Sequence, residues 1–299
     1  MKTKKTMLCV LGFMLLFTVA AASAADAPKL TFKFTTINVP GALRNVPDDI
    51  NNAGVTVGLY VDSSDVQHGY ILKGKNLTTL DDPNGTNTAA NGINFNGAVM
   101  VVGSYTNSSR NSVGFLYKDG KFTDIPGPTG ATSSYANGIN DQGWIVGDYE
   151  DSRGNYHGFL LQGDTYTTLD VPGATGSFAT GINNKGNIVL GWWSSIGVYY
   201  KGAITKDLGK TYHRLKVPHT GTLGSIPSDI NNEGDIVFYW YETSRAHLSA
   251  LLHAGTYYKF NYPKAYQSAG NGINDRNTIV GPYQLTEGGT VSGYKATFK

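Results

Sequence analysis

Short apolar segments separated by polar turns run through most of the sequence. Residues 144–147 (Trp-Ile-Val-Gly) and 187–191 (Asn-Ile-Val-Leu-Gly) are apolar and β-branched, and each follows a turn rich in asparagine and glycine. Segments of this length and composition, bounded by such turns, predict β-strands. With Gly 38 and Tyr 19 among 299 residues, the composition also favours sheets and turns over long helices.

One motif, Gly-Ile-Asn-x-x-Gly or its variant beginning with Asp, occurs six times. Its isoleucines are spaced by 43, 46, 43, 48 and 43 residues and are Ile50, Ile93, Ile139, Ile182, Ile230 and Ile273. In the last copy Asn277 stands where the others have glycine. Glycine and asparagine both tolerate the positive φ that a tight hairpin turn needs, so the motif predicts a turn between two strands.

Each repeat predicts four strands. The first ends at the Ile-Asn pair, the second is the apolar run after the turn, and residues 157–161 and 166–169 illustrate the third and fourth. Four strands in roughly 43 residues is the length of a propeller blade, whereas solenoid repeats of that length are mostly helical. We therefore predict an all-β fold, a six-bladed β-propeller of four-stranded blades, forming a single domain over residues 25–299.

The two ends of the chain are complementary. The sixth repeat reaches its third strand at residues 293–296 and the sequence stops at Lys299. Residues 35–42 match residues 167–174, which contain the fourth strand of the third repeat. We expect this N-terminal strand to complete the last blade and close the ring.

The first 24 residues have the pattern of a cleavable secretory signal. Lys2, Lys4 and Lys5 precede an apolar run, which ends in the small residues Ala22-Ser23-Ala24. An uncleaved membrane anchor is the alternative, since about 20 apolar residues can span a bilayer. We expect cleavage after Ala24, an extracellular or periplasmic location, a monomer, and no membrane span in the mature chain. The only cysteine, Cys9, would be removed with the signal.

The charge balance argues against a nucleic-acid-binding protein. The formal net charge is +2, but loss of the three lysines in the signal leaves 21 basic against 22 acidic side chains. A chain near neutrality lacks the excess of positive charge that drives binding to polyanions.

The repeat as a whole resembles a known family. Residues 138–147 (Gly-Ile-Asn-Asp-Gln-Gly-Trp-Ile-Val-Gly), His157-Gly158-Phe159 and residues 170–174 (Asp-Val-Pro-Gly-Ala) resemble the HAF-type extracellular repeat family of bacterial secreted proteins. The histidine motif is intact only at His68 and His157. The resemblance implies an exported, propeller-like repeat protein, and the family carries no established catalytic residues to transfer.

Aromatic residues recur near the end of the second strand in every repeat, as Tyr60, Tyr105, Tyr149, Trp193, Trp240 and Tyr283. A position that is filled in every blade predicts packing between blades, with a sugar-stacking surface as the alternative. Trp192, Tyr239 and Tyr241 are additional aromatics in the fourth and fifth repeats. The loops after the second strand contain Arg110, Arg153 and Arg245. These six residues are the candidate ligand-binding residues, because aromatic faces beside guanidinium groups suit sugars.

The sequence does not indicate a metal, a cofactor or a catalytic group. His68 and His157 occupy equivalent positions in different blades, which favours a hydrogen bond to the neighbouring blade over a shared metal. The repeated Asn and Asp residues lack the spacing of a calcium loop and are typical of turns that cap their own backbone. We expect a noncatalytic protein that binds a glycan or protein partner. A hydrolase or lyase with acids at the channel mouth and a structural envelope protein remain the alternatives.

Overall fold

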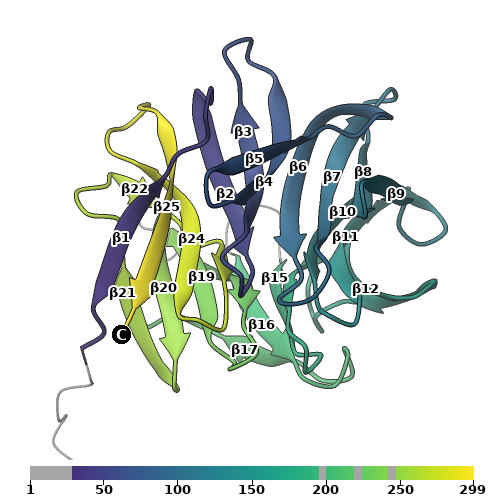
Figure 1. Cartoon of the computed structure of the whole chain (residues 1–299). Coiled ribbons are helices and arrows are strands. Elements are labelled where there is room, and N and C mark those ends of the chain that lie inside the picture. The colour runs from purple at the N-terminus through teal and green to yellow at the C-terminus, as the bar shows by residue number, and fades with distance from the viewer. Residues whose placement is uncertain (1–28, 195–199, 219–223, 242–246) are drawn as a thin grey trace, which may run out of the picture.

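The computed structural model describes residues 29–194, 200–218, 224–241 and 247–299 (Figure 1). Every regular element in these ranges is a β-strand, and the strands form six antiparallel sheets arranged as the blades of a propeller. The predicted signal peptide, residues 1–24, lies outside the described residues. No helix in the described ranges is of a length and apolarity that would cross a membrane.

The first three blades each contain four consecutive strands. Blade 1 is formed by β2 (Arg44–Ile50), β3 (Thr56–Val61), β4 (Gln67–Lys73) and β5 (Asn76–Leu80). Blade 2 is formed by β6 (Gly85–Ile93), β7 (Met100–Asn107), β8 (Ser112–Lys118) and β9 (Lys121–Ile125). Blade 3 is formed by β10 (Ala131–Ile139), β11 (Ile145–Asp151), β12 (Tyr156–Gln162) and β13 (Thr165–Leu169).

The next two blades follow the same plan, and the sixth combines both ends of the chain. Blade 4 is formed by β14 (Gly176–Ile182), β15 (Ile188–Trp193), β16 (Lys201–Thr205) and β17 (His213–Leu215). Blade 5 is formed by β18 (Ser225–Ile230), β19 (Ile236–Tyr241), β20 (His247–His253) and β21 (Thr256–Phe260). Blade 6 is formed by β22 (Gln267–Ser268), β23 (Gly272–Ile273), β24 (Thr278–Gln284), β25 (Val291–Phe298) and β1 (Phe32–Ile37).

The predicted closure of the ring is confirmed. Strand β1 pairs antiparallel with β25 over its whole length, from Phe32 opposite Phe298 to Ile37 opposite Gly293. Figure 1 shows the purple β1 beside the yellow β25. The chain ends thus share one sheet, so the last blade has its outer strand and the prediction of a six-bladed propeller holds.

The strand registers define two faces of the ring. In blade 1 the end of β5 lies beside the start of β4, because Leu80 is opposite Gly69. The loop between the second and third strands and the connection to the next blade therefore share one face, which we call the loop face. The hairpin turns after the first and third strands lie on the opposite face, which we call the turn face.

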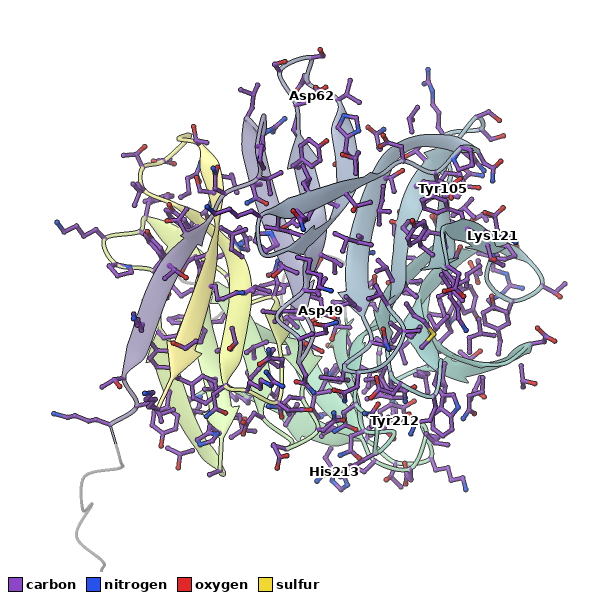
Figure 2. All side chains as sticks on the ribbon, viewed as in Figure 1. Asp49, Asp62, Tyr105, Lys121, Tyr212 and His213 are labelled. Atoms are coloured by element: carbon purple, nitrogen blue, oxygen red, sulfur yellow. The ribbon has the colours of Figure 1, made fainter. Side chains whose placement is uncertain are left out.

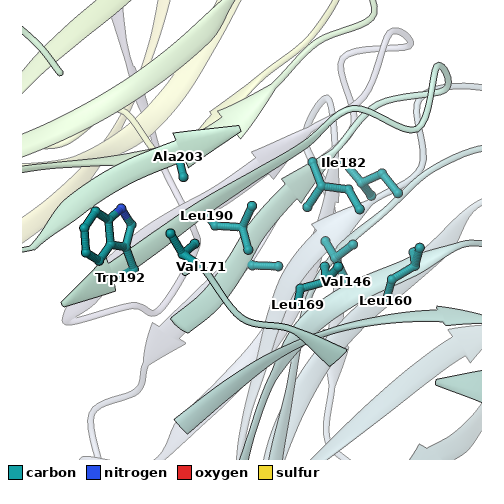
Figure 3. Close-up of a cluster of buried hydrophobic side chains, with 10 residues drawn as sticks. Val146, Leu160, Leu169, Val171, Ile182, Leu190, Trp192 and Ala203 are labelled. Atoms are coloured by element: carbon teal, nitrogen blue, oxygen red, sulfur yellow. The ribbon is translucent and has the colours of Figure 1, made fainter. Parts of the chain in front are cut away.

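The core consists of apolar clusters between adjacent blades. One cluster joins blades 3 and 4 and includes Val146, Leu160 and Leu169 from the former and Ile182 and Leu190 from the latter (Figure 3). Clusters of the same kind lie at the other five junctions. Because each blade is held chiefly by its two neighbours, burial of these side chains stabilises the ring as a whole.

The six asparagines of the repeated motif are buried on the turn face and form a belt around the ring. Their side-chain oxygens accept hydrogen bonds from their own turns, as Asn183 Oδ1 does from the backbone N–H of Lys185 and Asn187 at 3.0 Å each. The predicted capping of the turns is therefore confirmed. Asn183 Nδ2 also donates to the carbonyl oxygen of Asn231 in the next blade at 2.9 Å. Asn140, Asn231 and Asn274 make the same bond to the next blade, so in four of the six copies the motif asparagine fixes both the turn and the contact between blades. The belt asparagines are Asn51, Asn94, Asn140, Asn183, Asn231 and Asn274.

Candidate functional site

A β-bulge in the first strand of the blades directs polar side chains into the central channel. In blade 1 Pro47 pairs with Gly58 and Asp49 pairs with Val57, so Asp48 between them has no partner on the neighbouring strand. The same register shift occurs in blades 2 to 5. A bulge bends a strand locally and redirects its extra residue. The residues at this position, which we call the channel ring, are Asp48, Asn91, Asn137, Thr180, Ser228 and Asn271.

Five of the ring residues donate a hydrogen bond to the backbone of the following blade. Asn137 Nδ2 donates to Ala179 O at 2.9 Å, and Thr180 Oγ1 donates to Pro227 O at 2.8 Å. Asn91, Ser228 and Asn271 make the equivalent bonds to Ala136 O, Gly270 O and Pro47 O. Within the described ranges no group donates to the side-chain amide oxygens of the three ring asparagines. These oxygens are therefore available to accept hydrogen bonds in the channel.

Asp48 differs from the other five residues of the channel ring, because an ionised carboxylate has no hydrogen to donate. It instead accepts a hydrogen bond from Asn271 Nδ2 at 3.0 Å. Burial raises the pKa of Asp48 to about 8, an effect that the Asn271 hydrogen bond opposes and the charge of Asp49 reinforces. At neutral pH this carboxyl is largely protonated, and a protonated carboxyl can donate as well as accept.

A cavity of about 430 Å³ lies at the loop-face end of the channel. The channel ring forms its floor, and Tyr239 and His247 of blade 5 contribute to its wall. Their ring centroids are 5.9 Å apart with an angle of 34° between the planes. Burial lowers the pKa of His247, so the imidazole is neutral near pH 7. The cavity therefore combines hydrogen-bonding groups with aromatic surface, and its described lining residues include no lysine or arginine.

Beyond the ring the channel narrows to a space of about 20 Å³, enough for roughly one water molecule. Asp49 and Asp229 lie here, and burial raises the pKa of both carboxyls. Asp49 accepts backbone hydrogen bonds from Ile50 at 2.6 Å and from Ile93 of the next blade at 2.8 Å. Asp229 accepts one from Ile273 at 2.9 Å. These two carboxyls therefore link blades, and the narrow space keeps them from contact with a sugar-sized ligand. Figure 2 shows Asp49 near the middle of the molecule.

The structure places the three candidate aromatics differently. Tyr239 is half-buried and lines the channel cavity. Tyr241 is the last residue of β19 and pairs with His247, and its side chain lies outside the described part of the structure. Trp192 is only 1% exposed, and its indole N–H donates to Gly202 O at 3.4 Å. The indole ring of Trp192 is covered by the core between blades 3 and 4. The expectation that Trp192 stacks on a ligand therefore disagrees with the structure.

The error at Trp192 is one of register. Ser177 pairs with Trp192 as Ser134 pairs with Tyr149, so Trp192 occupies the aromatic position that recurs in the other blades. An alignment of Gly191 with Gly147 places Trp193 at that position instead. Counting ten residues from the repeat isoleucine would have found Trp192. The prediction that Trp193 fills the packing position is therefore wrong, and Trp192 fills it instead.

Trp193 is the additional aromatic of blade 4 that the sequence reading missed as a candidate. It is half-buried at the loop-face end of β15. Its ring centroid lies 6.0 Å from Tyr156, 6.0 Å from Phe178 and 5.9 Å from Tyr200. These four residues form an aromatic cluster across blades 3 and 4.

Two of the three candidate arginines, Arg110 and Arg153, lie away from the channel cavity. Arg110 and Arg153 are exposed in the loops after β7 and β11, and neither lines the cavity. The two positions are also not equivalent. Arg110 has a φ of 66°, as Gly154 has a φ of 81°, whereas Arg153 precedes that position. Arg245 lies outside the described residues. A binding role for these arginines stays a prediction.

His68 and His157 are each held between two aspartates of their own blade. His68 Nδ1 lies 2.8 Å from Asp81 Oδ1, and its Nε2 lies 3.5 Å from Asp62 Oδ2. His157 has the same arrangement with Asp170 at 2.8 Å and Asp151 at 3.5 Å. The expected hydrogen bond to the neighbouring blade is therefore wrong. The imidazole instead ties the loop after the second strand to the end of the fourth, which fixes the loop face locally.

The pKa of His68 reflects this double contact. Burial lowers it, but the hydrogen bonds and charges of Asp81 and Asp62 together raise it above the usual value for histidine. The imidazole also stacks on Tyr60, with ring centroids 5.0 Å apart. Because both nitrogens face carboxylates and one face is covered, His68 supports the loop rather than binding a metal. Across the described residues, no three His, Cys, Asp or Glu side chains are grouped as metal ligands.

Comparison with known proteins shows the fold. No protein-family model and no curated protein matches the sequence. Among solved structures, SapL1 lectin in complex with alpha methyl fucoside aligns with a TM-score of 0.54 at 10% identity, covering 86% of this chain and 95% of that one. TolB from Acinetobacter baumannii has a TM-score of 0.52 at 10% identity, covering 87% and 68%. AofleA from Arthrobotrys oligospora has a TM-score of 0.50 at 11% identity, covering 92% and 84%. Likeness at this identity shows a shared propeller architecture.

Proposed function

We propose that this protein is a noncatalytic glycan-binding propeller whose ligand occupies the channel cavity. The cavity itself carries the proposal, because ring asparagine oxygens that accept hydrogen bonds lie below the rings of Tyr239 and His247. Sugar hydroxyls donate to such oxygens, and the apolar face of a sugar ring packs against an aromatic side chain. Its volume of about 430 Å³ lies within the usual range for small-molecule sites. The SapL1 structure, which holds alpha methyl fucoside, supports the proposal by showing a sugar on this architecture.

A glycan array with purified residues 25–299, followed by affinity measurement on the best sugar, tests the proposal. Tyr239→Ala should weaken binding about tenfold or more, the effect of removing one anchor side chain. Tyr258→Ala is the matched control, since Tyr258 belongs to the same blade but does not line the cavity. Absence of any bound glycan, or equal loss in both variants, would refute the proposal.

An enzyme is the second candidate, and Asp48 is the observation that favours it. A carboxyl with a pKa of about 8 on the floor of a cavity has the protonation state of a general acid. The other channel carboxyls, Asp49 and Asp229, accept backbone hydrogen bonds in the narrow part. Incubation of the bound glycan with wild type and with Asp48→Asn distinguishes the candidates. Cleavage that Asp48→Asn abolishes without loss of binding would replace the binding role by hydrolysis.

We also propose that the protein is exported and belongs to the HAF-type repeat proteins that its sequence resembles. The support is the signal-like segment of residues 1–24 together with the six copies of the Ile-Asn turn. Expression of the full chain with its signal in a bacterial host tests export. A periplasmic or secreted product beginning at Ala25 is expected, and a product that retains residues 1–24 in the membrane would contradict it.

A further inference from the structure

One position between blades is apolar in five blades and charged in the sixth. The residue on the third strand opposite a buried valine of the second strand is Ile71, Leu116, Leu160, Ile204 or Leu251 in blades 1 to 5. In blade 6 the same position, opposite Val280, holds Lys295. Leu160 and Leu251 are fully buried against the next blade. The lysine at this position in blade 6 interrupts the seam, by which we mean the apolar contact between blades 6 and 1 that closes the ring.

Lys295 is half-buried, and no described carboxylate pairs with its ammonium group. Within the described ranges it forms no ion pair. Burial lowers its pKa from the usual value, because the charged ammonium is less well solvated there than in water. A buried charge is normally paired, since an uncompensated one destabilises the fold. Packing therefore does not explain why blade 6 has a lysine at the position where the other blades have Ile or Leu.

The seam beside Lys295 is open. A cavity of about 440 Å³ lies between blades 6 and 1, and we call it the seam pocket. Its lining includes Lys295, Lys75 and three polar residues of the N-terminal segment, Thr35, Thr36 and Asn38. Lys75 lies in the turn between β4 and β5 and is exposed. Two ammonium groups thus border a pocket that also offers hydroxyl and amide groups.

We propose that the seam pocket binds an acidic sugar, with its carboxylate paired to Lys295 and its hydroxyls facing the polar groups of residues 35–38. A carboxylate would supply the missing partner of the ammonium, and a charge-assisted hydrogen bond is stronger than a neutral one. The pocket is large enough for one or two sugar rings. It lies outside the channel cavity and shares no lining residue with it, so this site is independent of the proposed function.

NMR titration of residues 25–299 with D-glucuronate, D-glucose and inorganic phosphate tests the site. We expect wild type to bind glucuronate at least about tenfold more tightly than glucose, with the largest shifts at the amides of Thr35 and Thr36. Lys295→Leu should lose this preference. It introduces the residue that blades 2, 3 and 5 carry here, so the variant should fold, and Lys295→Gln gives a second uncharged variant of similar length. Lys33→Gln, on the same outer strand but outside the pocket, should bind as wild type does.

Each alternative result overturns a defined part of the assignment. Equal affinity for glucose and glucuronate, or undiminished binding by a folded Lys295→Leu protein, would exclude Lys295 as the anion partner. Phosphate binding as tight as glucuronate binding would mean that the pocket takes a bare anion and not a sugar. Glucuronate binding that is lost in Tyr239→Ala but kept in Lys295→Leu would place the ligand in the channel cavity. Failure of the channel proposal would leave these outcomes unchanged.

Discussion

Gly147 lies directly opposite Phe159 on the neighbouring strand of blade 3. Blades 1, 2 and 6 have the same combination of glycine and a large aromatic. Blades 4 and 5 invert it, with Leu190 opposite Ala203 and Phe238 opposite Ala250. The total size of each pair is thus roughly preserved while the large member changes strand. Close packing requires this, because neither a void nor a second large side chain fits between two blades.

Gly147→Ala should destabilise the protein substantially. An added Cβ would lie 1.9 Å from the carbonyl oxygen of Tyr135 and 2.9 Å from the ring of Phe159, and the first neighbour is backbone. We expect a loss of about 2 kcal/mol or more in the free energy of unfolding, measured by urea denaturation. Gly163→Ala, at φ +58° in open space, isolates conformational strain and should cost about 1 kcal/mol. Equal losses in the two variants would contradict the steric explanation.

Removal of β1 should open the ring. Deletion of residues 29–38 leaves the hydrogen-bonding edge of β25 unpaired and removes Ile37 from the cluster between blades 6 and 1. An exposed strand edge promotes association with other chains. We expect aggregation, or a clear drop in melting temperature, by light scattering and circular dichroism. A shorter deletion of residues 25–28 is the control, and a monomeric long-deletion protein with unchanged melting would argue against closure by β1.

Trp192→Ala and Trp193→Ala should have different effects although the residues are adjacent. Trp192 is buried in the core between blades 3 and 4, so its truncation leaves a cavity and should cost about 3 to 5 kcal/mol of stability. Trp193 is half-buried in the aromatic cluster, so its truncation should cost clearly less. Thermal and urea unfolding of both variants compare them. A larger loss at Trp193 would show that the register assigned here is incorrect.

Asp48→Asn should remove a pH-dependent loss of stability. The pKa of Asp48 is about 8 in the folded protein and 3.8 for an ordinary aspartate, so the folded state binds this proton more tightly. The stability that protonated Asp48 contributes to the folded state is therefore fully present below about pH 4 and is lost as the pH rises through about 8. Asparagine stays neutral and can donate to the next blade as the other ring residues do. Relative to wild type, the variant should gain stability between pH 5 and 8.

The size of that gain follows from the linkage between pKa and stability. One pKa unit corresponds to about 1.4 kcal/mol, so we expect the difference between variant and wild type to grow by at least that amount from pH 5 to pH 8. Urea unfolding at several pH values measures it. Asp65→Asn, at an exposed loop position, is the control variant. A constant difference across this range would mean that Asp48 is ionised throughout.

Local sequence patterns were sufficient to predict the blades and their closure. The Ile-Asn-x-x-Gly turn specifies a hairpin through its own side chain and the conformational freedom of its last residue, as the hydrogen bonds of Asn183 show. Six copies of a unit that cannot bury its own faces must pack against one another, and the match between residues 35–42 and 167–174 identifies the strand that closes them into a ring.

The position of each side chain depended on details that the repeat alone does not reveal. Along a strand successive side chains point to opposite faces, so a shift of one residue was enough to exchange the roles of Trp192 and Trp193. The bulge at Asp48 likewise has no distinctive residue type, because Asp, Asn, Thr and Ser all occupy it. The side chains at this position of the six blades come together only when the blades surround one axis. The sequence therefore determined the strands and their order, whereas contacts between distant repeats decided which residues form the channel ring, the channel cavity and the seam pocket.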